Sequence, residues 1–271
     1  ERGASVRILY DDIEKYKTDK KTGKRSPAGP WAKNRRAVDE AGIAALCQGR
    51  RNSSAIMHNK FFVLSEGGVP KAVWTGSTNL TENGIFGHSN VGHIVEDEQV
   101  ARAFLDYWTR LAEDPKVNNG YRAVNSDVSP SPPSPWKKGT CAVFSPRGTA
   151  SSFDALDWYA AVAGSARRAL LMTFAFGLDA RFKEVYRRDD DVLRMLLLEK
   201  AGNNPGTLAR DERDVQDIRN RVNVVVAMGN HIPTNMFDRW LEEMDRINPH
   251  VHVQWVHTKY MLVDPLGSDP I

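Results

Sequence analysis

Residues 256–264 read Val256-His257-Thr258-Lys259-Tyr260-Met261-Leu262-Val263-Asp264. Side chains of a β-strand alternate between its two faces, so a histidine and a lysine separated by one residue point to the same side. The apolar run that follows Lys259 is typical of a buried strand. We therefore expect His257 and Lys259 to reach one substrate atom from a single strand.

The same pattern occurs earlier in the chain. Residues 57–64 read Met57-His58-Asn59-Lys60-Phe61-Phe62-Val63-Leu64, and a second short motif follows at Gly76-Ser77-Thr78-Asn79. Glycine lets the backbone approach a ligand closely, and serine and asparagine side chains offer uncharged hydrogen-bonding groups. One His-x-Lys pattern carries little information, whereas two on similar predicted strands indicate a paired site.

The composition is that of a globular protein. Of the 271 residues, 41% are hydrophobic and 26% are charged, and the formal net charge is +3. No apolar run approaches the roughly 20 residues that a membrane-spanning helix needs. The mildly basic charge permits nucleic acid or an anionic lipid surface as a partner and requires neither. The sequence leaves the compartment and the oligomeric state unknown.

Predicted strands and helices alternate along the chain, which is typical of an α/β sheet with helices on its faces. Apolar runs predict strands over residues 4–10, 43–47, 57–64, 72–75, 91–95, 141–144, 170–176, 192–198, 222–228 and 251–256. Amphipathic patterns predict helices over residues 32–41, 98–111, 153–163, 179–187, 211–220 and 235–245.

Two segments break this alternation. Residues 14–36 are rich in lysine and arginine, and we interpret them as a polar loop, either a solvated insertion or a flap that contacts phosphate. Residues 113–138 contain a Pro/Ser run at 129–135 that favours extended polyproline geometry. We therefore predict a first lobe over residues 1–112, a linker over 113–138 and a second lobe over 139–271.

The two predicted lobes resemble each other. Residues 5–10 and 222–227 are both apolar, and each segment is followed by a loop, a helix, a strand and a His-x-Lys. This similarity indicates a duplicated lobe. Each copy lacks elements that the other has, so we expect the chain to be part of a longer protein, without the first strands of one lobe and the last part of the other.

The paired motifs and their order resemble the HxKxxxxD and GSxN signatures of the phospholipase D superfamily. The resemblance covers nearly the whole chain. It implies two α/β lobes with central mixed sheets flanked by helices, related by a pseudo-twofold axis that brings both motifs into one site. It also implies hydrolysis or exchange of phosphodiesters through a phosphohistidine intermediate, without a metal or another cofactor.

The resemblance assigns roles to individual residues. His58 corresponds to the usual nucleophile and His257 to the acid that protonates the leaving oxygen, although some members reverse these roles. Lys60 and Lys259 would offset charge on the nonbridging oxygens. Asn79 would add a neutral hydrogen bond in the active site. Two further residues complete the prediction, Ser77 as a substrate-binding group and Asp264 as the end of the second motif.

The first motif departs from the family pattern in two places. Ser65 stands where the motif would end in aspartate, and Ser89-Asn90 stands where many members place a carboxylate that orients the first histidine. Loss of that carboxylate would weaken stabilisation of an imidazolium. The alternative to an enzyme is therefore an inactive binding or scaffold module of the same fold.

The substrate is the least defined part of the prediction. A nucleic acid fits the basic loop, and a phospholipid, with contact to a membrane surface, fits the family name. The closely spaced His250 and His252 suggest zinc, but no carboxylate or cysteine completes four ligands, so we predict no metal site. His88 and His93 are interpreted as loop and strand-end residues.

Overall fold

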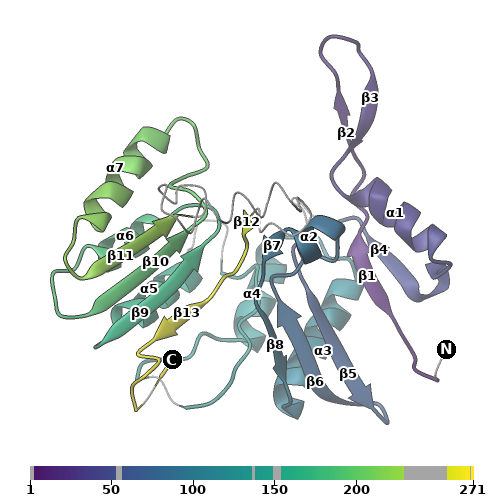
Figure 1. Cartoon of the computed structure of the whole chain (residues 1–271). Helices are drawn as coiled ribbons and strands as arrows, with labels where there is room; N and C mark the ends of the chain where they lie inside the picture. The colour runs from purple at the N-terminus through teal and green to yellow at the C-terminus, as the bar shows by residue number, and fades with distance from the viewer. Residues whose placement is uncertain (1–2, 53–56, 136–137, 149–153, 229–254, 269) are drawn as a thin grey trace. The chain divides into compact units, whose positions relative to one another are not determined.

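The computed structural model of the chain describes residues 3–52, 57–135, 138–148, 154–228, 255–268 and 270–271. These residues form a mixed α/β protein with several small sheets (Figure 1). The chain divides into two compact units. Unit 1 comprises Glu1–Asn59, Val63–Val73 and Val95–Ser152, and unit 2 comprises Lys60–Phe62, Trp74–Ile94 and Phe153–Ile271. The lobe boundaries predicted from the sequence, and the duplication of the lobes, stay predictions.

Unit 1 begins with a parallel pair of strands and a projecting hairpin. Strand β1 (Ile8–Asp11) pairs with β4 (Cys47–Arg50), and β2 (Lys15–Thr18) pairs antiparallel with β3 (Arg25–Ala28). The predicted polar loop over residues 14–36 is therefore wrong, since β2, β3 and the start of α1 (Trp31–Glu40) occupy it. A 3-10 turn, η1 (Ala44–Leu46), precedes β4 where a strand was expected.

Helices α3 (Glu98–Ala112) and α4 (Asn119–Val128) pack in unit 1. Phe144 stacks on Tyr107 of α3 with ring centroids 4.4 Å apart, and the Asn125 side chain of α4 donates to the Pro146 carbonyl at 2.9 Å. Helix α4 lies inside the predicted linker, because buried Tyr121 and Asn125 give this segment a packed face. Residues 141–144 form no strand, in contrast to the prediction.

A three-stranded sheet of β5 (Phe61–Glu66), β6 (Val69–Gly76) and β8 (Gly92–Val95) carries residues of both units. Strands β5 and β6 follow each other closely in the chain and are neighbours in this sheet. The strand predicted over residues 57–64 begins only at Phe61, so His58 and Lys60 precede it. Helix α2 (Glu82–Phe86) and the short strand β7 (His88–Ser89) connect β6 to β8.

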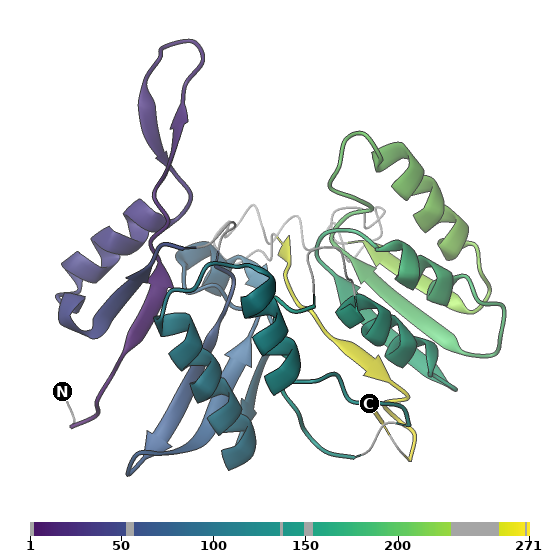
Figure 2. The ribbon, with the colours of Figure 1, turned by 180° about the vertical axis from the view of Figure 1, so that it is seen from behind.

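The main sheet of unit 2 has the strand order β11-β10-β9-β13. Its strands are β9 (Ala169–Phe174), β10 (Leu193–Leu198), β11 (Val224–Met228) and β13 (Met261–Val263), of which β13 alone is antiparallel to its neighbour. Helices α5 (Asp154–Gly164) and α6 (Ala180–Tyr186) lie over β9 and β10 (Figure 2). This half of the chain confirms the predicted alternation of strands and helices over its described residues.

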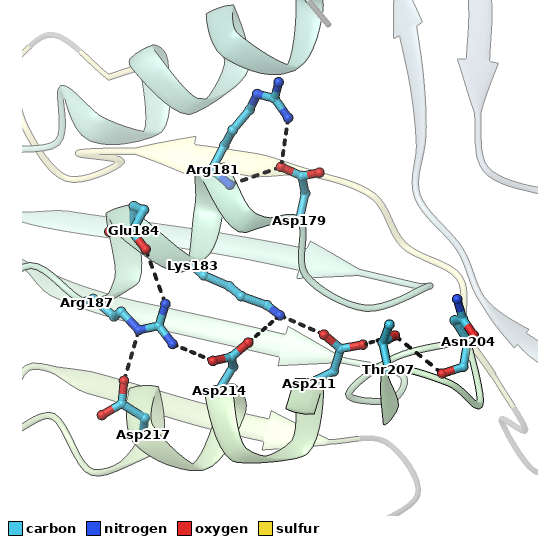
Figure 3. A network of polar contacts seen from close by, with 10 residues as sticks. All are labelled: Asp179, Arg181, Lys183, Glu184, Arg187, Asn204, Thr207, Asp211, Asp214 and Asp217. Atoms are coloured by element: carbon cyan, nitrogen blue, oxygen red, sulfur yellow. Dashed lines mark hydrogen bonds and ion pairs between the residues drawn. The ribbon is translucent and has the colours of Figure 1, made fainter. Parts of the chain in front are cut away.

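Helix α7 (Leu208–Arg219) is joined to α6 by a network of ion pairs (Figure 3). The Lys183 ammonium lies 2.8 Å from the Asp211 carboxylate and 2.7 Å from that of Asp214. Arg187 continues the network to Asp214 at 2.6 Å and to Asp217 at 2.9 Å. Hydrogen bonds from Lys183 lower the pKa of both Asp211 and Asp214, although partial burial opposes the shift. The network therefore fixes α7 against α6.

Lys183→Met is expected to lower the free energy of unfolding by about 3 kcal/mol, because it leaves Asp211 and Asp214 facing each other without a cation. This loss of unfolding free energy should disappear at acidic pH, where Asp211 and Asp214 are protonated. Carboxylates with lowered pKa stabilise the fold above their unfolded pKa of about 4 and lose that contribution as the pH falls through the folded value. Urea titrations at pH 7 and pH 3 measure both effects. Arg181→Met, at an exposed ion pair with Asp157, is the control and should change little.

Candidate active site

The second motif is positioned by a short parallel ladder in unit 2. Strand β12 (Trp255–Val256) pairs with β7 so that Val256 lies opposite Ser89, and the His257 backbone N–H donates to the Ser89 carbonyl at 3.1 Å. His257 is 7% exposed. This pairing joins segments 167 residues apart and places the histidine beside Asn90, to which its Nδ1 lies at 3.2 Å.

The orientation of the Asn90 amide determines which nitrogen of His257 carries a proton. The amide nitrogen of Asn90 donates to the carbonyls of Gly84 at 2.6 Å and His88 at 3.2 Å. Carbonyls only accept, so the other end of the amide, Oδ1, faces His257. An amide oxygen also only accepts, and His257 Nδ1 is therefore the donor. The neutral imidazole then carries its lone pair on Nε2.

This geometry corrects the expectation for Asn90. The sequence places it where a carboxylate would orient the first histidine, whereas the structure places it against the histidine of the second motif. A neutral amide stabilises an imidazolium less than a carboxylate does. Asn90 therefore holds the Nδ1–H of His257 without adding a negative charge beside the ring.

Asn90→Asp is expected to raise the pKa of His257, because a carboxylate beside Nδ1–H favours the charged imidazolium. An increase of about 1 unit or more is the effect of one close opposite charge. Titration of the imidazole by NMR measures it, with Asn220→Asp as a control that adds the same charge at an exposed position of unit 2. An unchanged His257 titration in Asn90→Asp would contradict the contact.

The two motif lysines converge in unit 2. Burial and, as the smaller cause, the positive charge of Lys259 together lower the pKa of Lys60 to about 8. Burial also lowers the pKa of Lys259, whose ammonium donates to the His257 carbonyl at 2.9 Å. Two partly desolvated cations that repel each other are stabilised by an anion between them. The arrangement therefore favours a bound anion beside His257.

Two residues of this region were not predicted as site residues. The His88 ring lies 4.9 Å from the His257 ring, and burial, together with the charge of Lys259, lowers its pKa while Glu199 opposes the shift. Glu199, 3% exposed, accepts a hydrogen bond from the Val256 N–H at 2.7 Å. The position of Glu199 directly after an apolar parallel strand is a signal that the sequence does contain.

The Gly-Ser-Thr-Asn motif has a structural part as well as a chemical one. A Cβ on Gly76 would lie 2.4 Å from the Val91 carbonyl oxygen, so this glycine is required by the neighbouring strand. Ser77 is buried; its hydroxyl lies 3.3 Å from Asn90 Oδ1 and accepts from the Val91 N–H at 3.0 Å. Ser77, predicted to bind substrate, thus holds Asn90 in place. Asn79 is partly exposed and lies in the same unit.

Asp264 lies away from the histidine of its motif. Its carboxylate accepts hydrogen bonds from the N–H groups of Arg167, Arg168 and Ala169, at the start of β9, with distances of 2.8–3.2 Å. Thr258 contacts Thr173, near the other end of β9. The structure therefore gives Asp264 the role of a clamp between β13 and β9, and it does not place this predicted catalytic residue beside His257.

The other predicted residues are distributed as follows. His58 is exposed and belongs to unit 1. His231, His250 and His252 lie outside the described residues. Within the described part of the chain, no three His, Cys, Asp or Glu side chains are grouped so that they could hold a metal ion. No helix there has the length and apolar character needed to cross a membrane.

Fold and site together define a mixed α/β protein with a histidine beside two converging lysines. A sequence profile of the family described as "Cardiolipin synthase, PLD-like domain" matches residues 1–112. Residues 1–112 therefore match a PLD-like domain of the phospholipase D superfamily, the family that the paired motifs resemble.

Comparisons beyond this family add little. No curated protein sequence matches the chain. Among solved structures, the crystal structure of polyphosphate kinase from Porphyromonas gingivalis superposes on 99% of the chain with a TM-score of 0.46 and 11% sequence identity. The chain spans 35% of that protein's length.

Proposed function

We propose that the protein is a metal-independent phosphodiesterase that acts through a phosphohistidine intermediate. The observation that carries this proposal is that the charge of Lys259, whose ammonium donates to the carbonyl of the buried His257, also acts on Lys60. A phosphodiester is an anion, and its transfer is promoted mainly by positioning and by offsetting charge on the nonbridging oxygens. The match of residues 1–112 to a PLD-like domain supports the same conclusion.

His257 is proposed as the nucleophile. Its Nδ1 proton is held by Asn90, so that Nε2 of the neutral ring carries the lone pair that would attack phosphorus. The step forms a P–N bond and breaks the bond from phosphorus to the leaving oxygen. This reverses the roles expected from the sequence, where His58 was the nucleophile.

His58 is then proposed as the acid that protonates the leaving oxygen. It stands two residues before Lys60, which limits the separation of their Cα atoms to about 7 Å. In the second step, His58 takes a proton from water, the water oxygen attacks phosphorus and the P–N bond breaks. In this proposal Ser77 holds Asn90 in place and Asp264 fixes β13. Asn79 donates or accepts a neutral hydrogen bond to the substrate.

The proposal is tested by incubating the full chain with bis(p-nitrophenyl) phosphate, a generic phosphodiester, in excess chelator. Cleavage that continues undiminished is the expected result. Cleavage that stops with chelator and returns with added metal would contradict the metal-independent mechanism, and no cleavage of this or any other phosphodiester would favour a binding module.

A further inference from the structure

The β2–β3 hairpin of unit 1 is an exposed arm with a strong positive charge. Figure 1 shows it standing out beyond α1 and β1 of its own unit. Residues 15–25 contain six cations and one carboxylate, Asp19. Among the described residues, no carboxylate forms an ion pair with any of the arm's five lysines, which are Lys15, Lys17, Lys20, Lys21 and Lys24. Other cations of the chain, such as Lys183, are neutralised by carboxylates.

The base of the arm is fixed to the rest of unit 1. Trp31 of α1, 8% exposed, donates its indole N–H to the Lys15 carbonyl at 2.9 Å. The Tyr16 ring meets the Trp31 ring edge-on with centroids 5.3 Å apart, and the Arg25 guanidinium covers Tyr16 at 3.9 Å. The arm is therefore held in one direction before any partner binds, which reduces the entropy lost on binding.

The tip of the arm presents lysines from an ordered turn. The Asp19 carboxylate accepts from the N–H groups of Lys21 and Thr22, both at 2.8 Å, and these bonds lower its pKa. Gly23 closes the turn with a φ of +68°. The single carboxylate of the arm is thus used by the backbone of the turn. The lysines around it remain exposed to solvent.

One face of the arm is open to an extended anion. The strand register pairs Lys15 with Ala28 and Lys17 with Ser26, so the two lysines share a face with small side chains. A two-stranded β-ribbon fits the major groove of a duplex, about 12 Å wide. The tip has no apolar side chain that would enter a lipid layer. These features favour a nucleic acid over a membrane.

We propose that the β2–β3 hairpin binds the phosphate backbone of double-stranded nucleic acid. This inference rests on the proposed function for its choice of a phosphodiester polymer and narrows the substrate to that class. Backbone contacts by lysine carry no base specificity, so the arm would bind many sequences with similar affinity. Each phosphate neutralised adds about 0.9 to the slope of log K against log salt concentration.

The test measures binding, so it is independent of turnover. The full chain with His257→Ala, which should not cleave, is titrated into a fluorescent duplex of about 25 base pairs over a range of salt concentrations. K20Q/K21Q/K24Q is expected to weaken binding about tenfold and to reduce the salt slope by about 3. K116Q/R210Q/R213Q removes the same charge from exposed sites outside the arm and should change the Kd by less than about twofold.

Equal losses in the two triple variants, or no binding of the duplex, would overturn the proposal. So would a tip variant that binds duplex normally and loses binding to vesicles of anionic phospholipid. Thermal unfolding of both variants shows whether each is folded. If the arm binds the duplex but the wild type cleaves no phosphodiester, the proposed catalysis is contradicted. The proposed binding role of the arm is then still supported.

Discussion

His257→Ala is expected to reduce phosphodiester cleavage by about 10⁴-fold or more, because it removes the proposed nucleophile that forms the P–N bond. Rates under single-turnover conditions measure this loss directly. His93→Ala is the matched control, since His93 is an exposed histidine of the same unit and should leave the rate unchanged.

The same variant separates an enzyme from a scaffold. An inactive binding module has no turnover for His257→Ala to change. If the fold persists, its affinity for a phosphodiester should also stay the same. Because His257 is buried between β7 and Lys259, thermal unfolding must accompany the rates. A folded His257→Ala protein that cleaves at the wild-type rate would contradict the proposed role.

Lys259→Met is expected to lower kcat by about 10²–10³-fold, the cost of removing one group that stabilises transition-state charge. It should also change the pH dependence. Lys60, with a pKa of about 8, loses its charge as the pH rises, so kcat/KM of the wild type for an anionic substrate should fall above about pH 8.

Removing Lys259 removes one of the two causes that lower the pKa of Lys60. The alkaline limb of kcat/KM should therefore move to higher pH in Lys259→Met, even as the overall rate falls. Lys116→Met, at an exposed lysine of unit 1, should leave both the rate and the limb unchanged. An alkaline limb that stays in place would show that Lys60 and Lys259 are not coupled.

The sequence predicts the strands and helices of unit 2 well because their patterns are strong. Strands β9, β10 and β11 are rich in apolar residues, as is common in parallel strands, although one face of β10 and β11 is partly exposed. The β2–β3 hairpin escapes prediction because lysines occupy its strands and no alternation of apolar and polar side chains marks it. Helix α4 is hidden by the neighbouring Pro/Ser run, although Asn118 caps its first turn.

Some features of the candidate site can likewise be predicted from the sequence, and others cannot. The paired motifs lead to the prediction that Lys60, His257 and Lys259 belong to one site, since the residue types and their spacing are local properties of the sequence. The contact between Asn90 and His257 is not local, because it depends on the pairing of β7 with β12. Asp264 was predicted as part of the chemistry, and only the position of the β9 backbone shows that it is a clamp.

The phosphohistidine mechanism is tested most directly by trapping the intermediate. The full chain is mixed with a slowly hydrolysed ³²P-labelled phosphodiester, denatured at alkaline pH, where phosphohistidine survives, and digested for mass spectrometry. The label is expected on the peptide that contains His257. Label on His58 would contradict the assignment of the nucleophile, and a chain that turns over substrate without label on any histidine would contradict the mechanism itself.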